Sequence, residues 1–316
     1  MTAALPEGLT APAPRRELSV TSADGARLHV EEFGPGDGPA VVLVHGWTCA
    51  IAFWGPVIRR LVADGYRVIA YDLRGHGRSP APAAPDGYGT EQLADDLCAV
   101  LEATLGEGEQ AVVGGHSMGG MTIMAAARRP QLRERAAALM LCSTGAAHLV
   151  PEARVVPVRP AALRTRVQRA LLGSSAPLGP VTPMARAVLR YGTMGPGAPR
   201  ERVELCTRIV HACPRRVRAA WAHVLDILDL TDGPGALTQP TAVVVGTADR
   251  LTPPPHAHRI VAALPHCTGL TELTGAGHMT PVEAPEAVGA VLSKLVREHL
   301  TPVSSIRSTV VTEEKS

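Results

Sequence analysis

The sequence predicts an α/β protein built on a mostly parallel, twisted β-sheet with helices on both faces. Runs of five to seven mostly apolar residues recur along the chain, and such runs are typical of strands buried on both faces of a parallel sheet. Segments with helical periodicity separate several of these runs. With 316 residues, 46% of them hydrophobic, the chain can bury roughly three quarters of its unfolded surface in one large core.

The chain begins with a Pro- and Ala-rich stretch, residues 1–17, which we expect to be a flexible arm. Residues 18–21 and 28–31 alternate with period two around the turn dipeptide Asp24-Gly25, and this pattern predicts a β-hairpin. Residues 40–44 and 67–72 then read as buried strands.

Two helices are expected among these strands. The first covers residues 53–63. The second, residues 91–105, has apolar residues at spacings of three and four, which leaves Asp95 and Asp96 facing solvent.

Residues 112–120 read as a strand, a sharp turn and a helix, with Ser117 at the tip of the turn. Gly115 and Gly119 flank it in a Gly-x-Ser-x-Gly pattern, the nucleophile elbow, in which small neighbours let strand and helix pack closely and the serine Oγ is exposed. Met118 opens the helix, so its backbone N–H is expected to point toward the same space and to donate to a developing oxyanion.

At this point the sequence resembles the α/β-hydrolase family, and four further stretches carry the resemblance. They are His45-Gly46-Trp47, the loop Asp72 to Ser79, Asp249 just after the strand 241–246, and Gly277-His278-Met279. The resemblance implies an α/β-hydrolase fold with an oxyanion hole formed by the N–H groups of Trp47 and Met118. Asp72 and Arg74 are expected to have a structural role and to fix their loop by a charge-assisted hydrogen bond.

The predicted catalytic triad is Ser117, Asp249 and His278, in the family's chain order of serine, acid and histidine. Asp249 lies beyond the carboxyl end of a strand, where parallel sheets build their sites. The competing position for the acid, after strand 136–142, has Ser143-Thr144-Gly145 and no acid. Thr280 to Glu283 follow His278 with the pattern of a helix capping box.

Alternation of strand and helix stops between residues 145 and 235, where Pro and Gly recur. We interpret 145–235 as a helical cap inserted into a core of residues 18–144 and 236–300, and residues 301–316 as a disordered polar tail. The cap is expected to set substrate choice. The predicted pocket residues are Trp47, Phe53, Trp221 and Met279, although Phe53 and Trp221 could instead pack in the core.

The expected cap is basic, with 13 Arg against 6 acids. This excess could steer anionic ligands. Alternatively, the arginines could form a solvated face with their long stems over apolar surface.

These features together predict a serine hydrolase that cleaves a carboxylic ester or lactone through an acyl-enzyme. A carbon–carbon bond hydrolase, a thioesterase and a cofactor-free haloperoxidase or perhydrolase share the triad and remain alternatives, as does a non-catalytic ligand-binding protein. A serine nucleophile disfavours haloalkane dehalogenases and epoxide hydrolases, which use Asp. The sequence does not identify the substrate, its acyl length or the oligomeric state.

Composition narrows the remaining classes. The net charge of +2 gives no case for nucleic-acid binding, and no apolar run is long enough for a membrane span. The first residues lack a signal-peptide pattern, so a cytoplasmic location is expected. The six cysteines are dispersed, which predicts neither a metal site nor a disulfide framework, and no cofactor is expected.

Overall fold

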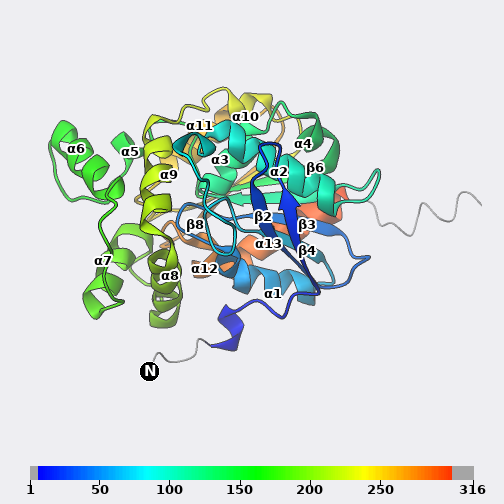
Figure 1. Ribbon diagram of the computed structural model, residues 1–316, viewed down its shortest axis with the longest axis horizontal. Coiled ribbons are helices and arrows are strands. Elements are labelled where there is room, and N and C mark those ends of the chain that lie inside the picture. Colours follow the sequence, from blue (N-terminus) through cyan, green and yellow to red (C-terminus); the bar gives the residue numbers. More distant parts are fainter. Residues whose placement is uncertain (1–5, 301–316) are drawn as a thin grey trace, which may run out of the picture.

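A computed structural model describes residues 6–300 and contains one eight-stranded sheet in the order β1-β2-β4-β3-β5-β6-β7-β8 (Figure 1). β2 is antiparallel to both β1 and β4, and every other neighbouring pair is parallel. The expected hairpin is therefore present, and the sheet is mostly parallel as predicted. The strands are β1 (Arg16–Thr21), β2 (Arg27–Phe33), β3 (Ala40–Val44), β4 (Arg67–Tyr71), β5 (Ala111–His116), β6 (Ala136–Cys142), β7 (Thr241–Gly246) and β8 (Cys267–Leu273).

Helices cover both faces of the sheet, because alternate residues of the central strands are apolar on both sides. In β3, Val42 and Val44 belong to one apolar cluster, while Val41 and Leu43 belong to the other. The first cluster also contains residues of α2 (Thr90–Thr104), α3 (Met118–Ala125), α4 (Pro130–Arg135) and α11 (Pro254–Ala263). The second contains residues of α1 (Gly55–Ala63) and α13 (Pro285–His299).

Six helices lie between β6 and β7, within the segment expected to be a cap. Figure 1 shows α6 and α7 at one end of the molecule, with α9 between α6 and the sheet. Short 3-10 turns elsewhere cover Glu7–Leu9, Ile51–Trp54 and Pro85–Gly87. The six helices are α5 (Leu149–Glu152), α6 (Ala161–Leu172), α7 (Pro183–Thr193), α8 (Arg200–Ala212), α9 (Arg215–Ile227) and α10 (Gly233–Ala236).

The expectation that Asp96 faces solvent is wrong. Its side chain is fully buried and accepts two hydrogen bonds from Arg74, from Nη2 at 2.6 Å and from Nε at 2.8 Å. Arg74 also pairs with Asp24 at 2.7 Å, and these carboxylates raise the pKa of Arg74 although burial alone would lower it. A buried guanidinium needs carboxylates beside it to compensate for its lost hydration. Asp96 supplies one of them, so this acidic residue of α2 lies in the core and not at the surface.

Asp72 fixes its loop through charge-assisted hydrogen bonds to backbone groups, whereas Arg74 pairs with Asp96 and Asp24. The two carboxylate oxygens of Asp72 accept hydrogen bonds from the backbone N–H groups of Ile51 and Arg78, each at 2.8 Å. Asp72 thus joins its own loop, at Arg78, to the segment that begins at Ile51. The expected arm at residues 1–17 and tail at 301–316 fall partly or wholly outside the described residues, and within the former β1 already begins at Arg16.

Candidate active site

Ser117 lies at the turn between β5 and α3, in a backbone conformation that non-glycine residues rarely adopt, with φ 53° and ψ −117°. The surrounding backbone is tightly packed. A Cβ on Gly115 would lie 2.4 Å from the carbonyl oxygen of Gly119, and a Cβ on Gly119 would lie 2.1 Å from that of Val44. The two glycines are therefore sterically required, and the strained turn between them projects Ser117 from the end of the sheet.

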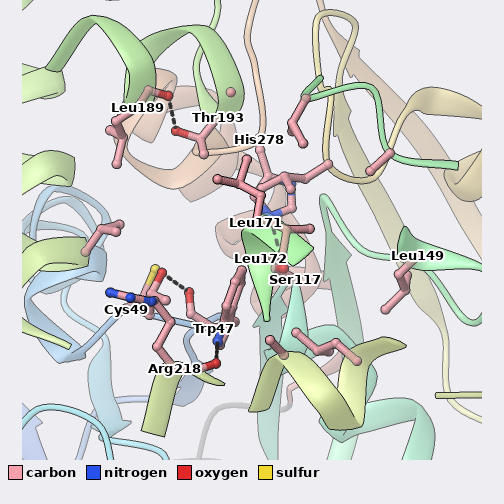
Figure 2. Close-up of a pocket in the computed structure, with 18 of the residues that line it drawn as sticks. Trp47, Cys49, Ser117, Leu149, Leu171, Leu172, Leu189, Thr193, Arg218 and His278 are labelled. Atoms are coloured by element: carbon pink, nitrogen blue, oxygen red, sulfur yellow. Dashed lines mark hydrogen bonds between the residues drawn. The ribbon is translucent and has the colours of Figure 1, made fainter. Parts of the chain in front are cut away.

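Three side chains from distant segments form a hydrogen-bonded chain at this point. The Oγ of Ser117 is 3.0 Å from Nε2 of His278 (Figure 2). Nδ1 of His278 is 2.8 Å from Oδ2 of Asp249. All three residues are buried. Because Nδ1–H donates to the carboxylate, Nε2 is free to accept the hydroxyl proton. The structure thus brings together the three residues predicted for the triad.

Asp249 is oriented by its own loop. Its Oδ1 accepts hydrogen bonds from the backbone N–H groups of Leu251, at 2.8 Å, and Thr252, at 2.9 Å. The hydroxyl of Thr252 donates to Oδ2 at 2.9 Å and is 3.2 Å from Nδ1 of His278. Sequence reasoning missed Thr252, although an Asp that caps the backbone two and three residues later is a recognisable turn pattern.

Buried histidines support the loops around Ser117. Nε2 of His116 donates to the carbonyl oxygen of His278 at 2.8 Å, and burial holds the pKa of His116 well below its ordinary value. Nε2 of His76 accepts from the N–H of Thr48 at 3.1 Å, beside Trp47. Burial lowers the pKa of His76 to about 4 and that of His45 to about 3. These imidazole rings are therefore neutral at physiological pH, and they hold the loops in place through hydrogen bonds.

The loop that carries His278 is held by groups that the sequence did not reveal. The backbone N–H groups of His278 and Met279 both donate to the carbonyl oxygen of Thr193, at 2.7 and 3.2 Å. The carboxylate of Glu283 accepts from the N–H of Gly195 at 2.7 Å and from that of Gly277 at 3.1 Å. Burial raises the pKa of Glu283, while these hydrogen bonds act in the opposite direction. The end of α7 and the residues just after it therefore fix the histidine loop directly.

The predicted capping box at Thr280 is wrong. Thr280 begins the short helix α12 (Thr280–Glu283), which is separate from α13, and its hydroxyl lies 2.9 Å from that of Ser143 rather than capping a helix. The carboxylate of Glu283 instead accepts a hydrogen bond from the backbone N–H of Gly277, in the loop that precedes the helix.

A cavity of about 450 Å³ opens over Ser117 and His278 (Figure 2), within the range of small-molecule sites. Trp47 and Met279 line it, as expected. Phe53 and Trp221 do not, so their assignment to the pocket is wrong. Phe53 is fully buried against the His116 ring, 4.6 Å between centroids. Trp221 is fully buried and donates from Nε1 to the carbonyl oxygen of Arg74, because the apolar face of α9 packs on the core.

Most of the cavity wall comes from the segment between β6 and β7, and it is largely apolar. Arg218 is the one charged side chain among the lining residues of this segment; one of its Nη atoms donates to the carbonyl oxygens of Ser174 and Ala176. None of these wall positions was assigned to the pocket from the sequence. They include Leu149, Val155, Leu171, Leu172, Val188, Leu189, Val210 and Leu225.

Within residues 6–300, no group of three or more His, Cys, Asp or Glu side chains is arranged to hold a metal ion. No helix in the same range combines the length and apolar character needed to cross a membrane.

The chain is similar to known proteins in sequence and in fold. Residues 41–291 match the model of a family described as "Alpha/beta hydrolase family". The chain is 31% identical over 281 residues to "Putative carbamate hydrolase RutD" of Variovorax paradoxus. The aligned residues make up 88% of this chain and 97% of that protein. A non-heme chloroperoxidase of Streptomyces lividans is 41% identical over 102 residues, 32% of this chain and 36% of that protein. A thermophilic esterase from Thermogutta terrifontis superposes with a TM-score of 0.70 at 28% identity, covering 90% and 100% of the two chains.

Proposed function

Because this chain belongs to the α/β-hydrolase family, we propose that it is a serine hydrolase that cleaves apolar carboxylic esters or lactones through an acyl-enzyme. The observation that carries the proposal is the hydrogen-bonded chain from Ser117 through His278 to Asp249. An esterase among the similar structures supports the same class of reaction.

In the first half of the reaction, Oγ of Ser117 attacks the substrate carbonyl carbon while its proton passes to Nε2 of His278. The bond between Oγ and carbon forms, and the carbonyl oxygen becomes an oxyanion. Asp249 holds the imidazole tautomer and stabilises the imidazolium that results. When the tetrahedral intermediate collapses, the ester C–O bond breaks and the leaving oxygen takes the proton from Nε2.

The backbone N–H groups of Met118 and Trp47 are the proposed oxyanion donors. Met118 is the first residue of α3, so its N–H has no acceptor within the helix and benefits from the helix dipole. The loop that carries Trp47 passes beside the nucleophile, since a Cβ on Gly46 would lie only 2.9 Å from Cβ of Ser117. Donors fixed in this way before the reaction stabilise the developing charge without reorganisation.

In the second half, a water molecule replaces the leaving group. His278 accepts a proton from the water as its oxygen bonds to the acyl carbon, and the C–Oγ bond then breaks with return of the proton to Ser117. The products are a carboxylic acid and the free enzyme.

We assign residues 145–235 the role of a cap that selects the substrate. Its aliphatic side chains form most of the cavity wall, so the preferred acyl or alcohol group is apolar. Each additional methylene in such a pocket changes selectivity by about 1–3 kcal/mol.

A labelling experiment tests the proposal. A fluorophosphonate probe should label the wild-type protein on Ser117, and Ser117→Ala should neither be labelled nor turn over p-nitrophenyl esters. Ser143→Ala is the matched control, because Ser143 is also buried and has a positive φ, but its hydroxyl is hydrogen-bonded to that of Thr280 rather than to His278. Turnover by folded Ser117→Ala, or labelling at another serine, would reject the mechanism.

A further inference from the structure

The α6–α7 lobe, defined as residues 153–200, has an unusual charge composition. It contains eight arginines and no Asp, Glu, Lys or His, whereas the whole chain has 31 basic and 29 acidic residues. The eight are Arg154, Arg159, Arg164, Arg166, Arg169, Arg186, Arg190 and Arg200.

Most of this charge is not neutralised by the protein. Arg169 pairs with Asp226 at 2.6 Å, and Arg186 pairs with Glu204. Within residues 6–300 the other six arginines form no ion pair with a carboxylate. Arg159 and Arg166 are exposed. The lobe therefore presents an excess of positive charge to whatever lies against it.

The same lobe carries nearly all of the exposed large apolar side chains. Eight such side chains occur in the described part of the chain, and seven lie in the lobe. On α6 they are spaced by four residues and on α7 by four and three, so each helix presents one apolar stripe. The seven are Leu163, Val167, Leu171, Leu178, Met184, Val188 and Tyr191.

The exposed stripes continue into the cavity. Leu171, Leu178, Val188 and Tyr191 are exposed and also line the cavity that contains Ser117. Figure 1 shows α6 and α7 at one end of the molecule, and α9 lies between α6 and the sheet. The lobe can thus meet a flat surface without obstruction by the core.

We propose that the α6–α7 lobe docks the protein on an anionic lipid surface. The arginines match the negative headgroups, and the apolar stripes match the boundary between headgroups and acyl chains. A surface that offers both features fits better than a purely acidic partner, which would leave seven large apolar side chains unexplained. Docking would place the mouth of the cavity at the interface, where apolar molecules concentrate. The proposal goes beyond the proposed function, and it is tested by binding rather than by hydrolysis.

The experiment is flotation of the full-length protein with phosphatidylglycerol vesicles and with phosphatidylcholine vesicles. The wild type should float with the anionic vesicles and separate from them at high salt, because salt screens the charges. Removing two exposed arginines in R159Q/R166Q should weaken binding roughly twenty- to thirty-fold, about five-fold for each charge. L163S/M184S, which changes exposed apolar side chains that do not line the cavity, should weaken it as well.

The matched control is R128Q/R297Q, which removes the same charge from exposed positions outside the lobe and should bind like the wild type. Thermal melts and turnover of a water-soluble acetate ester should be unchanged in all three variants. Failure of the wild type to float, or equal loss of binding in the control, would overturn the proposal. Dissociation of an oligomer by L163S/M184S, without vesicle binding by the wild type, would assign the lobe to contacts between copies instead.

Discussion

Replacement of Asp249 by Asn should abolish nearly all activity while leaving the fold intact. An asparagine oxygen can keep the two hydrogen bonds that Oδ1 accepts from the N–H groups of Leu251 and Thr252, so the loop should keep its shape. The amide nitrogen then faces Nδ1 of His278, at the position of the carboxylate oxygen now 2.8 Å away. Because that nitrogen can only donate, Nδ1 must lose its proton, and Nε2 carries one toward Ser117.

Such a histidine cannot accept the serine proton. We expect kcat to fall by about 10⁴, as in other triads, which corresponds to about 5 kcal/mol in the activation barrier. Steady-state hydrolysis of a p-nitrophenyl ester measures the effect, and a thermal melt checks the fold. Asp226→Asn is the control, since Asp226 pairs with Arg169 and is not among the residues that line the cavity. A folded Asp249→Asn variant within about tenfold of wild-type kcat, or an equal loss in the control, would refute the reasoning.

Three further predictions follow from the packing around the site. Trp221→Ala should lower the free energy of unfolding by about 3–5 kcal/mol and leave the order of ester preference unchanged. Leu189→Ala should instead shift the preference toward esters with bulkier acyl groups. The reverse pattern, measured with a series of esters, would contradict the assignment of Leu189 to the cavity wall and of Trp221 to the core. His76 has a folded-state pKa of about 4 against about 6.5 when unfolded, so protonation favours unfolding and stability is lost as pH falls through this window. His76→Gln should therefore make the pH dependence of the melting temperature shallower between those values, and an unchanged slope would argue against a buried neutral ring. Glu283→Gln should lower kcat about tenfold with little change in KM, because it loosens the loop that carries His278; unchanged kcat in the folded variant would show that the hydrogen bonds to Glu283 do not position the base.

The sequence alone predicted the sheet and the strained turn at Ser117. Strand identity depended on local runs of apolar residues, and both faces of a strand such as β3 are buried as expected. The elbow at Ser117 was recognisable because a strained turn with close backbone approach needs glycine at specific neighbours. Asp249 was predicted from its position after a strand, since the carboxyl ends of parallel strands converge on one edge of a sheet, and His278 was predicted from the family resemblance of its motif.

The tertiary structure decided which helix faces and side chains are buried and which residues pack against them. Asp96 of α2 was predicted to face solvent, but it is buried because Arg74 approaches it from the loop after β4. The apolar stripe of α9 could equally line a pocket or pack on a core, and Trp221 is in the core because Arg74 and Tyr88 lie against it.

The support for His278 comes from segments far away in the chain, which local patterns do not report. Thr193 and Gly195 lie in the segment between β6 and β7, yet they fix the histidine loop. Periodicity and turn chemistry act over a few residues and can be read directly from a sequence. Burial, ion pairing and cavity shape depend on contacts between distant segments, so only the folded structure determines them.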